Sequence, residues 1–227
     1  MDYTVKKVEQ HFDKIAVEYD YWKKKNHTYY SALKDFVRRQ VPSGSLVVEF
    51  GCATGDILAA TEPAQGLGID NSLQMIERAI KKYPHLRFIK ADVGNLQIEE
   101  RFDYMIMADI LDHTCEIEKT IKSANKILNQ AGKIVISTLN PLWGPAISLC
   151  DKLKLKMPEG PHYFVPLKKM TSMVTREGFK IETAGYRLLC PIAIPLLSDL
   201  LNNHIARWPL FSRFCFVQCI VASKISK

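Results

Sequence analysis

The feature that most constrains the fold is a short apolar run that enters a glycine-rich turn at residues 45–56. Residues 45–50 are almost continuously apolar, which is typical of a strand buried on both faces of a parallel sheet. Further strands are predicted at 66–70, 86–89, 104–108 and 132–138, with helices at 56–62, 72–83 and 116–128 between them. Strands that alternate with helices in this way predict right-handed crossovers and a doubly wound, mostly parallel α/β sheet.

The segments on either side are predicted to add a lid and a cap. Apolar residues spaced by three and four from Val5 to Tyr19 predict one amphipathic helix that ends at Tyr19 and Asp20, and a second helix is predicted at 29–40, ahead of Pro42. Prolines and glycines punctuate 141–166, after which a helix at 167–176 and a strand at 179–186 resume the fold. A closing strand is predicted at 214–222. We therefore expect one domain over 1–227 with seven strands: a helical lid (1–40), a ligand-binding core (45–140), a cap (141–211) and a closing-strand segment (212–227).

Three properties of the sequence bear on the compartment. The first 20 residues include Asp2, Glu9, Asp13 and Glu18 and have no apolar core, so they do not resemble a secretory signal. The longest apolar stretch, 191–201, is interrupted and too short to span a bilayer. The six cysteines lack paired spacing, which favours free thiols over disulfides or a metal site. We expect a cytoplasmic protein that binds no metal.

Small and acidic residues follow the predicted strands, where ligands of a doubly wound sheet bind. Gly51 and Gly55 allow the backbone to approach a ligand closely. Asp70 closes the second strand, where a carboxylate can accept hydrogen bonds from both hydroxyls of a ribose. Asp92 follows the third strand, where an adenine amino group could donate to it, and Asp109 ends the fourth strand.

The turn does not fit a dinucleotide. That fingerprint has glycine at the first, third and sixth positions, because a pyrophosphate lies against the turn. Here those positions hold Gly51, Ala53 and Asp56. A carboxylate is a poor neighbour for a pyrophosphate, so a nucleoside ligand without phosphates fits better.

At this point the residues resemble the class I S-adenosylmethionine-dependent methyltransferases, over residues 46–138. One departure is Ala53, where many members carry glycine, but alanine still leaves room for the methionine moiety. Each matching segment is weak alone, whereas five in order at the family's spacing are specific. The five segments are Glu49-x-Gly51-x-x-x-Gly55, Gly68-Ile69-Asp70-Asn71-Ser72 with Met75, Ala91-Asp92-Val93, residues 102–109 and residues 128–136.

The resemblance implies S-adenosyl-L-methionine as cofactor. It implies that the glycine turn binds the methionine end, that Glu49 shapes the pocket for the ammonium group and that Asp70 takes the ribose hydroxyls. Met75 would pack near the adenosine, and Asp92 with Val93 would hold the adenine. The segment at Tyr19 resembles a lid over the cofactor, although Tyr19 could equally end a packed apolar stripe. The residues assigned to the cofactor are Tyr19, Glu49, Gly51, Cys52, Ala53, Gly55, Asp70, Asn71, Met75, Asp92, Val93 and Asp109.

Methyl transfer is a displacement at a sulfonium carbon, so the cofactor supplies the reactivity. The protein must align the acceptor and, for a hydroxyl, remove a proton. His162 follows the fifth strand, where small-molecule members place substrate residues, and is the candidate general base; the alternative is a hydrogen-bonded histidine of a structural loop. His113, just past the fourth strand, is expected to pack on the cofactor side.

Several observations bear on the acceptor. The segment from Asp109 to Asp112 lacks the Pro-Pro-aromatic turn that amino-group methylation of bases uses, and Cys190-Pro191 has the reverse order of the pyrimidine C5 enzymes. The net charge of +7 lies in the last 77 residues, because the chain up to Cys150 has 19 basic and 19 acidic residues. These basic residues accompany apolar runs. A cap helix that buries its apolar face behind a solvated lysine rim is the favoured explanation, and a membrane interface or an amphipathic acceptor is the alternative.

We therefore expect a methyltransferase that acts on a small-molecule or lipid-like acceptor, most readily at oxygen, with possible peripheral membrane contact and no nucleic acid. Two alternatives stay open. One is RNA or protein methylation guided by the basic tail, which can contact phosphates, although no aromatic side chain is interleaved with lysines 152, 154 and 156. The other is a non-catalytic module that binds a nucleoside.

Overall fold

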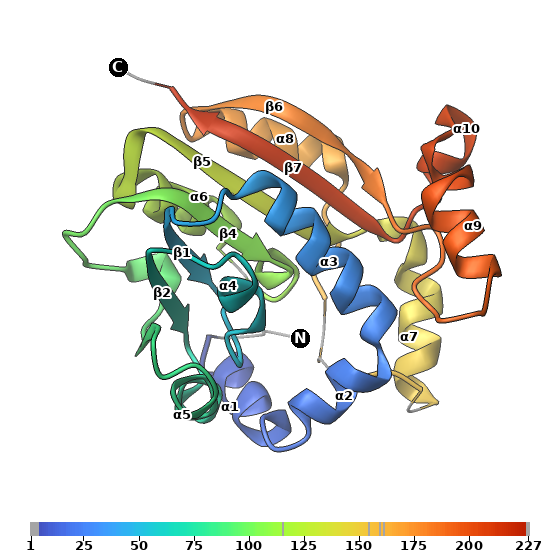
Figure 1. Ribbon diagram of the computed structural model, residues 1–227, viewed down its shortest axis with the longest axis horizontal. Coiled ribbons are helices and arrows are strands. Elements are labelled where there is room, and N and C mark those ends of the chain that lie inside the picture. Colours follow the sequence, from blue (N-terminus) through green and yellow to red (C-terminus); the bar gives the residue numbers. More distant parts are fainter. Residues whose placement is uncertain (1–4, 115, 154, 159, 161, 226–227) are drawn as a thin grey trace.

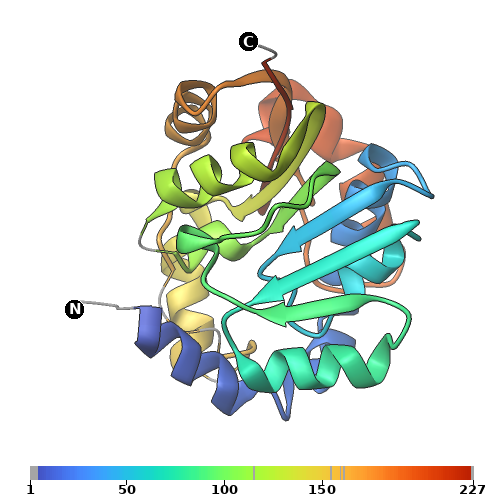
Figure 2. The same cartoon turned by 90° about the vertical axis from the view of Figure 1, so that its left-hand side faces the viewer.

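A seven-stranded sheet runs through the centre of the molecule, with helices on both faces (Figures 1 and 2). The computed structural model describes residues 5–114, 116–153, 155–158, 160 and 162–225. The strand order is β3-β2-β1-β4-β5-β7-β6. Strands β1 to β5 are parallel to one another, and β7 is antiparallel to both β5 and β6. The predicted doubly wound, mostly parallel sheet is confirmed.

The parallel half of the sheet is buried on both faces, as its apolar strands require. In β1, Val47 packs with Leu33 and Ile57 on one face, and Val48 packs with Ile121 on the other; both valines are fully buried. The elements of this half are β1 (Leu46–Phe50), α4 (Asp56–Ala60), β2 (Gln65–Asp70), α5 (Leu73–Lys82), β3 (Arg87–Lys90), β4 (Phe102–Ala108), α6 (Ile117–Ile127) and β5 (Leu128–Leu139).

The N-terminal segment folds as three helices, α1 (Val5–Ile15), α2 (Tyr19–Lys25) and α3 (His27–Gln40). The prediction of one helix that ends at Tyr19 and Asp20 was wrong, because a turn at 16–18 separates α1 from α2 and these two residues begin α2. The apolar spacing continues across the turn, so periodicity alone could not reveal it. Helix α2 is held by contacts of its own, because Asp20 in its first turn accepts hydrogen bonds from Thr54 and Lys82.

The C-terminal third combines sheet elements with peripheral helices. Helix α8 and strand β6 fall inside the segment predicted as the cap, but β6 is an edge strand of the sheet and α8 packs against it. Helices α7, α9 and α10 form the right-hand flank of the molecule in Figure 1. No helix in the described part of the chain is long and apolar enough to cross a membrane. The elements are α7 (Gly144–Lys152), α8 (Leu167–Arg176), β6 (Phe179–Arg187), α9 (Leu197–Asn203), α10 (Pro209–Ser212) and β7 (Val217–Lys224).

Candidate functional site

At two positions of the turn between β1 and α4, the backbone leaves no room for a side chain. Gly51 has φ +67° and Gly55 has φ +80°, a left-handed conformation that strains residues with a Cβ. A Cβ on Gly51 would lie 2.8 Å from the Cβ of Ile110, and one on Gly55 would lie 2.8 Å from the ring of Phe88. Glycine at these two positions therefore keeps the backbone close to the carboxyl ends of the strands.

Asp70 closes β2 and is braced across this turn. Its Oδ2 accepts from the backbone N–H of Ala53 at 2.9 Å and its Oδ1 accepts from that of Ser72 at 2.8 Å. Burial raises the pKa of this carboxyl, and the backbone donors oppose the shift. Each carboxylate oxygen has a second lone pair with which it can accept from ligand hydroxyls. Beside it, the Nδ2 of Asn71 is buried without a hydrogen-bond partner among the described residues, as suits a donor meant for a ligand.

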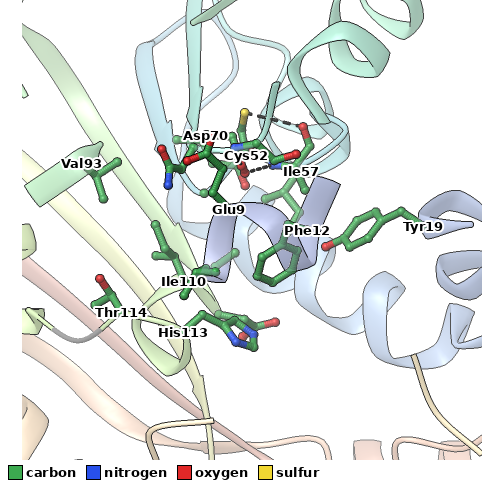
Figure 3. A pocket seen from close by; sticks show the side chains of 18 of the residues that line it. Glu9, Phe12, Tyr19, Cys52, Ile57, Asp70, Val93, Ile110, His113 and Thr114 are labelled. Atoms are coloured by element: carbon green, nitrogen blue, oxygen red, sulfur yellow. Dashed lines mark hydrogen bonds between the residues drawn. The ribbon is translucent and has the colours of Figure 1, made fainter. Parts of the chain in front are cut away.

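These groups line a cavity between the strand ends and helices α1 and α2 (Figure 3). Phe12 and Tyr19 reach the cavity from α1 and α2, and Asp70 lies in the wall formed by the sheet. Two residues predicted for the cofactor do not line it: Gly55 is the N-cap residue before α4, and Met75 is fully buried in α5. The ten that do are Tyr19, Glu49, Gly51, Cys52, Ala53, Asp70, Asn71, Asp92, Val93 and Asp109.

One wall of this cavity holds buried acidic and basic side chains. Glu49 is buried, and its Oε2 accepts from the backbone N–H of Leu58 at 2.9 Å. Burial raises the pKa of Glu49 to about 8. Lys23 of α2 lies in the same lining, with its Nζ 2.6 Å from Oδ2 of Asp56. Burial lowers the pKa of Lys23 and raises that of Asp56, but Lys23 and Lys82 outweigh the burial of Asp56 and hold its pKa below the usual range.

A second cavity of about 330 Å³ adjoins the first. Its volume lies within the range of small-molecule sites. Three residues, Tyr30, Asp109 and His113, line both cavities and so mark their boundary. Most of the wall comes from α7 and from loops within the predicted cap, and it is mainly apolar. Its apolar side chains include Leu139, Trp143, Ile147, Leu155, Met157, Ile192 and Phe216.

Asp109 occupies the boundary in a strained conformation. Its φ is +61°, in the left-handed region that costs a non-glycine residue about 1–3 kcal/mol. Both carboxylate oxygens are fastened: Tyr29 Oη donates to Oδ2 at 2.6 Å, and Ser137 Oγ donates to Oδ1 at 2.7 Å. The two hydrogen bonds fix the orientation of the carboxylate where the cavities meet.

The candidate base, His162, lines the second cavity and not the first. Its ring centroid lies 4.7 Å from that of His113, and its other neighbour is Phe164, stacked at 5.6 Å. Burial and the charge of Lys156 lower the pKa of His162 to about 4. The imidazole is therefore neutral at neutral pH, which is the form that can accept a proton.

Four residues around the cavities were missed by the sequence reasoning: Lys23, Tyr29, Tyr30 and Asp112. A signal existed for Lys23, because it lies four residues after Tyr19 and so on the same helical face. However, Lys23 begins a run of three lysines, and such a run is typical of a solvent-exposed surface. No local pattern marks the other three, because each reaches its cavity through tertiary packing.

Comparison with known proteins agrees with this geometry. Residues 21–184 match a family described as a methyltransferase domain. The demethylmenaquinone methyltransferase of Staphylococcus saprophyticus is 29% identical over 125 residues, which are 51% of this chain and 54% of that protein. An uncharacterised protein of Methanocaldococcus jannaschii is also 29% identical, over 57% of this chain and 61% of its own length. The chain thus spans about half to three fifths of the length of these curated relatives.

Solved structures share the fold. A methyltransferase of Thermotoga maritima, described as a possible histamine N-methyltransferase, aligns with a TM-score of 0.74 and 16% identity, over 96% of this chain and 99% of that one. The family match covers well over half of the chain, and the sheet of this chain has seven strands in a mostly parallel order. The chain therefore belongs to the class I S-adenosylmethionine-dependent methyltransferase family.

Proposed function

We propose that this chain transfers a methyl group from S-adenosyl-L-methionine to a small or lipid-like acceptor held in the second cavity. The observation that carries the proposal is the pair of adjoining cavities. The first is lined by the residues that a nucleoside joined to an amino acid requires, and the second is apolar and of small-molecule size. A donor in one cavity and an acceptor in the other would meet at the boundary marked by Asp109 and His113.

Different residues of the first cavity bind different parts of the cofactor. Asp70 accepts from the ribose hydroxyls through the lone pairs that its two backbone donors leave open. Asp92 and Val93 hold the adenine, the glycine turn holds the methionine end, and Glu49 receives the α-ammonium group. When bound, the cofactor supplies a methyl group on a sulfonium centre.

For an oxygen acceptor, the base is His162. Its neutral imidazole lines the acceptor cavity beside His113, where it would take the proton of an acceptor hydroxyl. If a hydroxyl compound is found to be methylated, His162→Asn should lower kcat about 100-fold or more while S-adenosylhomocysteine still binds. Unchanged turnover in this variant would remove His162 from the role.

The surroundings of the second cavity support a lipid-like acceptor and a cytoplasmic protein that touches a membrane at its periphery. Of the 19 large apolar side chains that are exposed in the described chain, 13 belong to residues 142–214. Leu155 and Ile192 belong to this set and also line the cavity, so its mouth opens within the apolar flank formed by α7, α9, α10 and their loops. Arg207 and Trp208 add a cation and an interfacial aromatic side chain to this flank. A relative whose name gives demethylmenaquinone as its acceptor is consistent with this class.

Calorimetry with S-adenosylhomocysteine tests the cofactor, and we expect micromolar binding. A panel of lipid-soluble phenols and quinols, small alcohols, amines, RNA and peptides, each supplied with methyl-labelled cofactor, tests the acceptor. Label in an apolar hydroxyl compound supports the proposal. Label only in RNA, peptide or amine would replace the acceptor class, and cofactor binding without label in any class would favour a nucleoside-binding module. Sedimentation with phosphatidylglycerol vesicles against phosphatidylcholine vesicles tests the membrane contact, which predicts stronger binding to the anionic vesicles.

A further inference from the structure

The first cavity contains an imbalance of charge. Among the described residues that line it are five acidic side chains, and Lys23 is the one lysine or arginine. The methionine end of the cofactor is a zwitterion, with an α-ammonium and an α-carboxylate. A carboxylate buried without a counter-charge or donors would be strongly unfavourable. The acidic wall can receive the ammonium group, but the α-carboxylate needs a positively charged side chain or hydrogen-bond donors.

The backbone of the glycine turn does not offer enough donors. The N–H groups of Gly51 and Cys52 both donate to the carbonyl of Ile69, at 2.8 and 3.1 Å. The N–H of Ala53 donates to Asp70, and that of Gly55 donates to the carbonyl of Cys52. Four of the five amides in the turn are therefore already used within the protein, and the anionic group must be met by a side chain.

The side chain of Lys23 is placed to do this. It is 10% exposed, and its ammonium lies 5.2 Å from the ring centroids of both Tyr19 and Tyr30. The Nζ donates to Asp56 at 2.6 Å and has further donors available, because an ammonium group carries three N–H bonds. The two rings and the ion pair hold the charge in the lining of the cavity rather than in solvent.

We propose that Lys23 binds the α-carboxylate of S-adenosylmethionine and thereby ties helix α2 of the lid to the cofactor. The inference rests on the proposed function and adds a residue and a role to it. Asp56 then acts as a positioning residue, since it holds the ammonium from the side of α4. Asp20 fastens the same helix nearby, where it accepts from Thr54 and Lys82. Recognition of the amino-acid end and closure of the lid would thus depend on one side chain.

The test compares two ligands that differ in this end. S-Adenosylhomocysteine has the amino-acid group, whereas 5′-methylthioadenosine has the adenosine and the thioether without it. By calorimetry, Lys23→Met should weaken S-adenosylhomocysteine about 10- to 100-fold, the loss of one charge-assisted contact, and change 5′-methylthioadenosine less than about threefold. Lys24→Met is the matched control, because Lys24 is the next residue of the same helix and is exposed; it should leave both affinities unchanged.

The outcomes separate this inference from the proposed function. If the native protein binds neither ligand, the proposed function fails. If Lys23→Met binds S-adenosylhomocysteine as tightly as the native protein, or weakens both ligands equally, the assignment of Lys23 is wrong while the function can stand. If Lys23→Met fails to fold, the affinities of two ligands for the native protein test the assignment instead. The methyl ester of S-adenosylhomocysteine, which lacks the carboxylate charge, should bind at least about tenfold more weakly than the parent compound. Equal affinity would overturn the assignment.

Discussion

The two cavities adjoin each other but are built by different means. In the first, polar groups sit at strand ends and in one glycine turn, and backbone contacts hold them: Asp70 by two amides and Glu49 by one. In the second, most of the wall is apolar, and a large share of it comes from α7 and from loops at 155–157 and 191–192. Strand ends therefore shape the first cavity, whereas the second cavity, which we propose for the acceptor, depends largely on a peripheral helix and loops outside the sheet.

The largest effect on the first cavity is expected when the carboxylate of Asp70 is removed. We expect Asp70→Ala to weaken S-adenosylhomocysteine about 100-fold or more, because two charge-assisted hydrogen bonds to the ribose and the brace to Ala53 are lost together. Calorimetry measures the change. Asp199→Ala, an exposed carboxylate on α9, is the control and should bind normally. Equal affinities in the two variants would contradict the placement of the ribose.

The glycine turn can be tested through stability. Gly51→Ala should lower the free energy of unfolding by about 2 kcal/mol, because the left-handed φ is strained and the new Cβ meets Ile110. Gly185→Ala in β6 is matched to it, since φ is not positive there and no atom lies within 4 Å of the added Cβ. Its effect should stay within about 0.5 kcal/mol. Urea denaturation of both variants checks this, and similar losses in the two would argue against a tight turn.

A third prediction concerns pH. Glu49 stays protonated in the folded protein up to about pH 8, whereas the unfolded chain loses this proton above its ordinary pKa of 4.5. The folded state binds more protons in that window, so the contribution of Glu49 to stability falls as the pH rises through it. Glu49→Gln should therefore gain stability over the native protein by about 1 kcal/mol per pH unit between pH 5 and pH 8. Denaturation at pH 5, 6.5 and 8 measures the gain; a difference independent of pH would show that Glu49 is ionised in the unliganded protein.

The smallest effect on folding is expected on the apolar flank. Leu196 is 88% and Leu200 is 50% exposed, so replacing both with serine should change stability by less than about 0.5 kcal/mol and leave cofactor affinity unchanged. Binding to phosphatidylglycerol vesicles should fall at least severalfold. The control pair is Leu73→Ser and Ile80→Ser on α5, far from the flank (Figure 1), where the two side chains are 44% and 47% exposed. If both pairs reduce vesicle binding equally, the flank is not the membrane-binding surface.

The sequence was sufficient for the parts of the molecule that follow local rules. Strand ends in a parallel sheet share one edge, so Asp70, Asp92 and Asp109 could be placed around one cleft before the structure was known. Ser72 is the N-cap of α5, where its hydroxyl accepts from the backbone N–H of Met75, a role typical of serine ahead of a helix. Met75 itself was expected near the adenosine, but it lies in the core because its helical face points to the sheet.

The contacts at the boundary between the two cavities could not be predicted from the sequence. Tyr29 reaches Asp109 across 80 residues of sequence, and His113 meets His162 across 49. Such pairs depend on how α3 and the loops pack onto the sheet, and no local spacing encodes them. The turn at 16–18 was missed because the apolar spacing of three and four residues continues across it while the direction of the chain changes.

The position of β7 has a consequence for the order of assembly. It is the last strand along the chain, yet it lies between β5 and β6 in the sheet. Strand β6 pairs with no other strand than β7 among the described residues. During synthesis, β6 emerges before the strand with which it pairs, so it can join the sheet only after β7 has emerged. The edge of the sheet beyond β5 is therefore completed last, by the strand that joins β6 to the rest of the sheet.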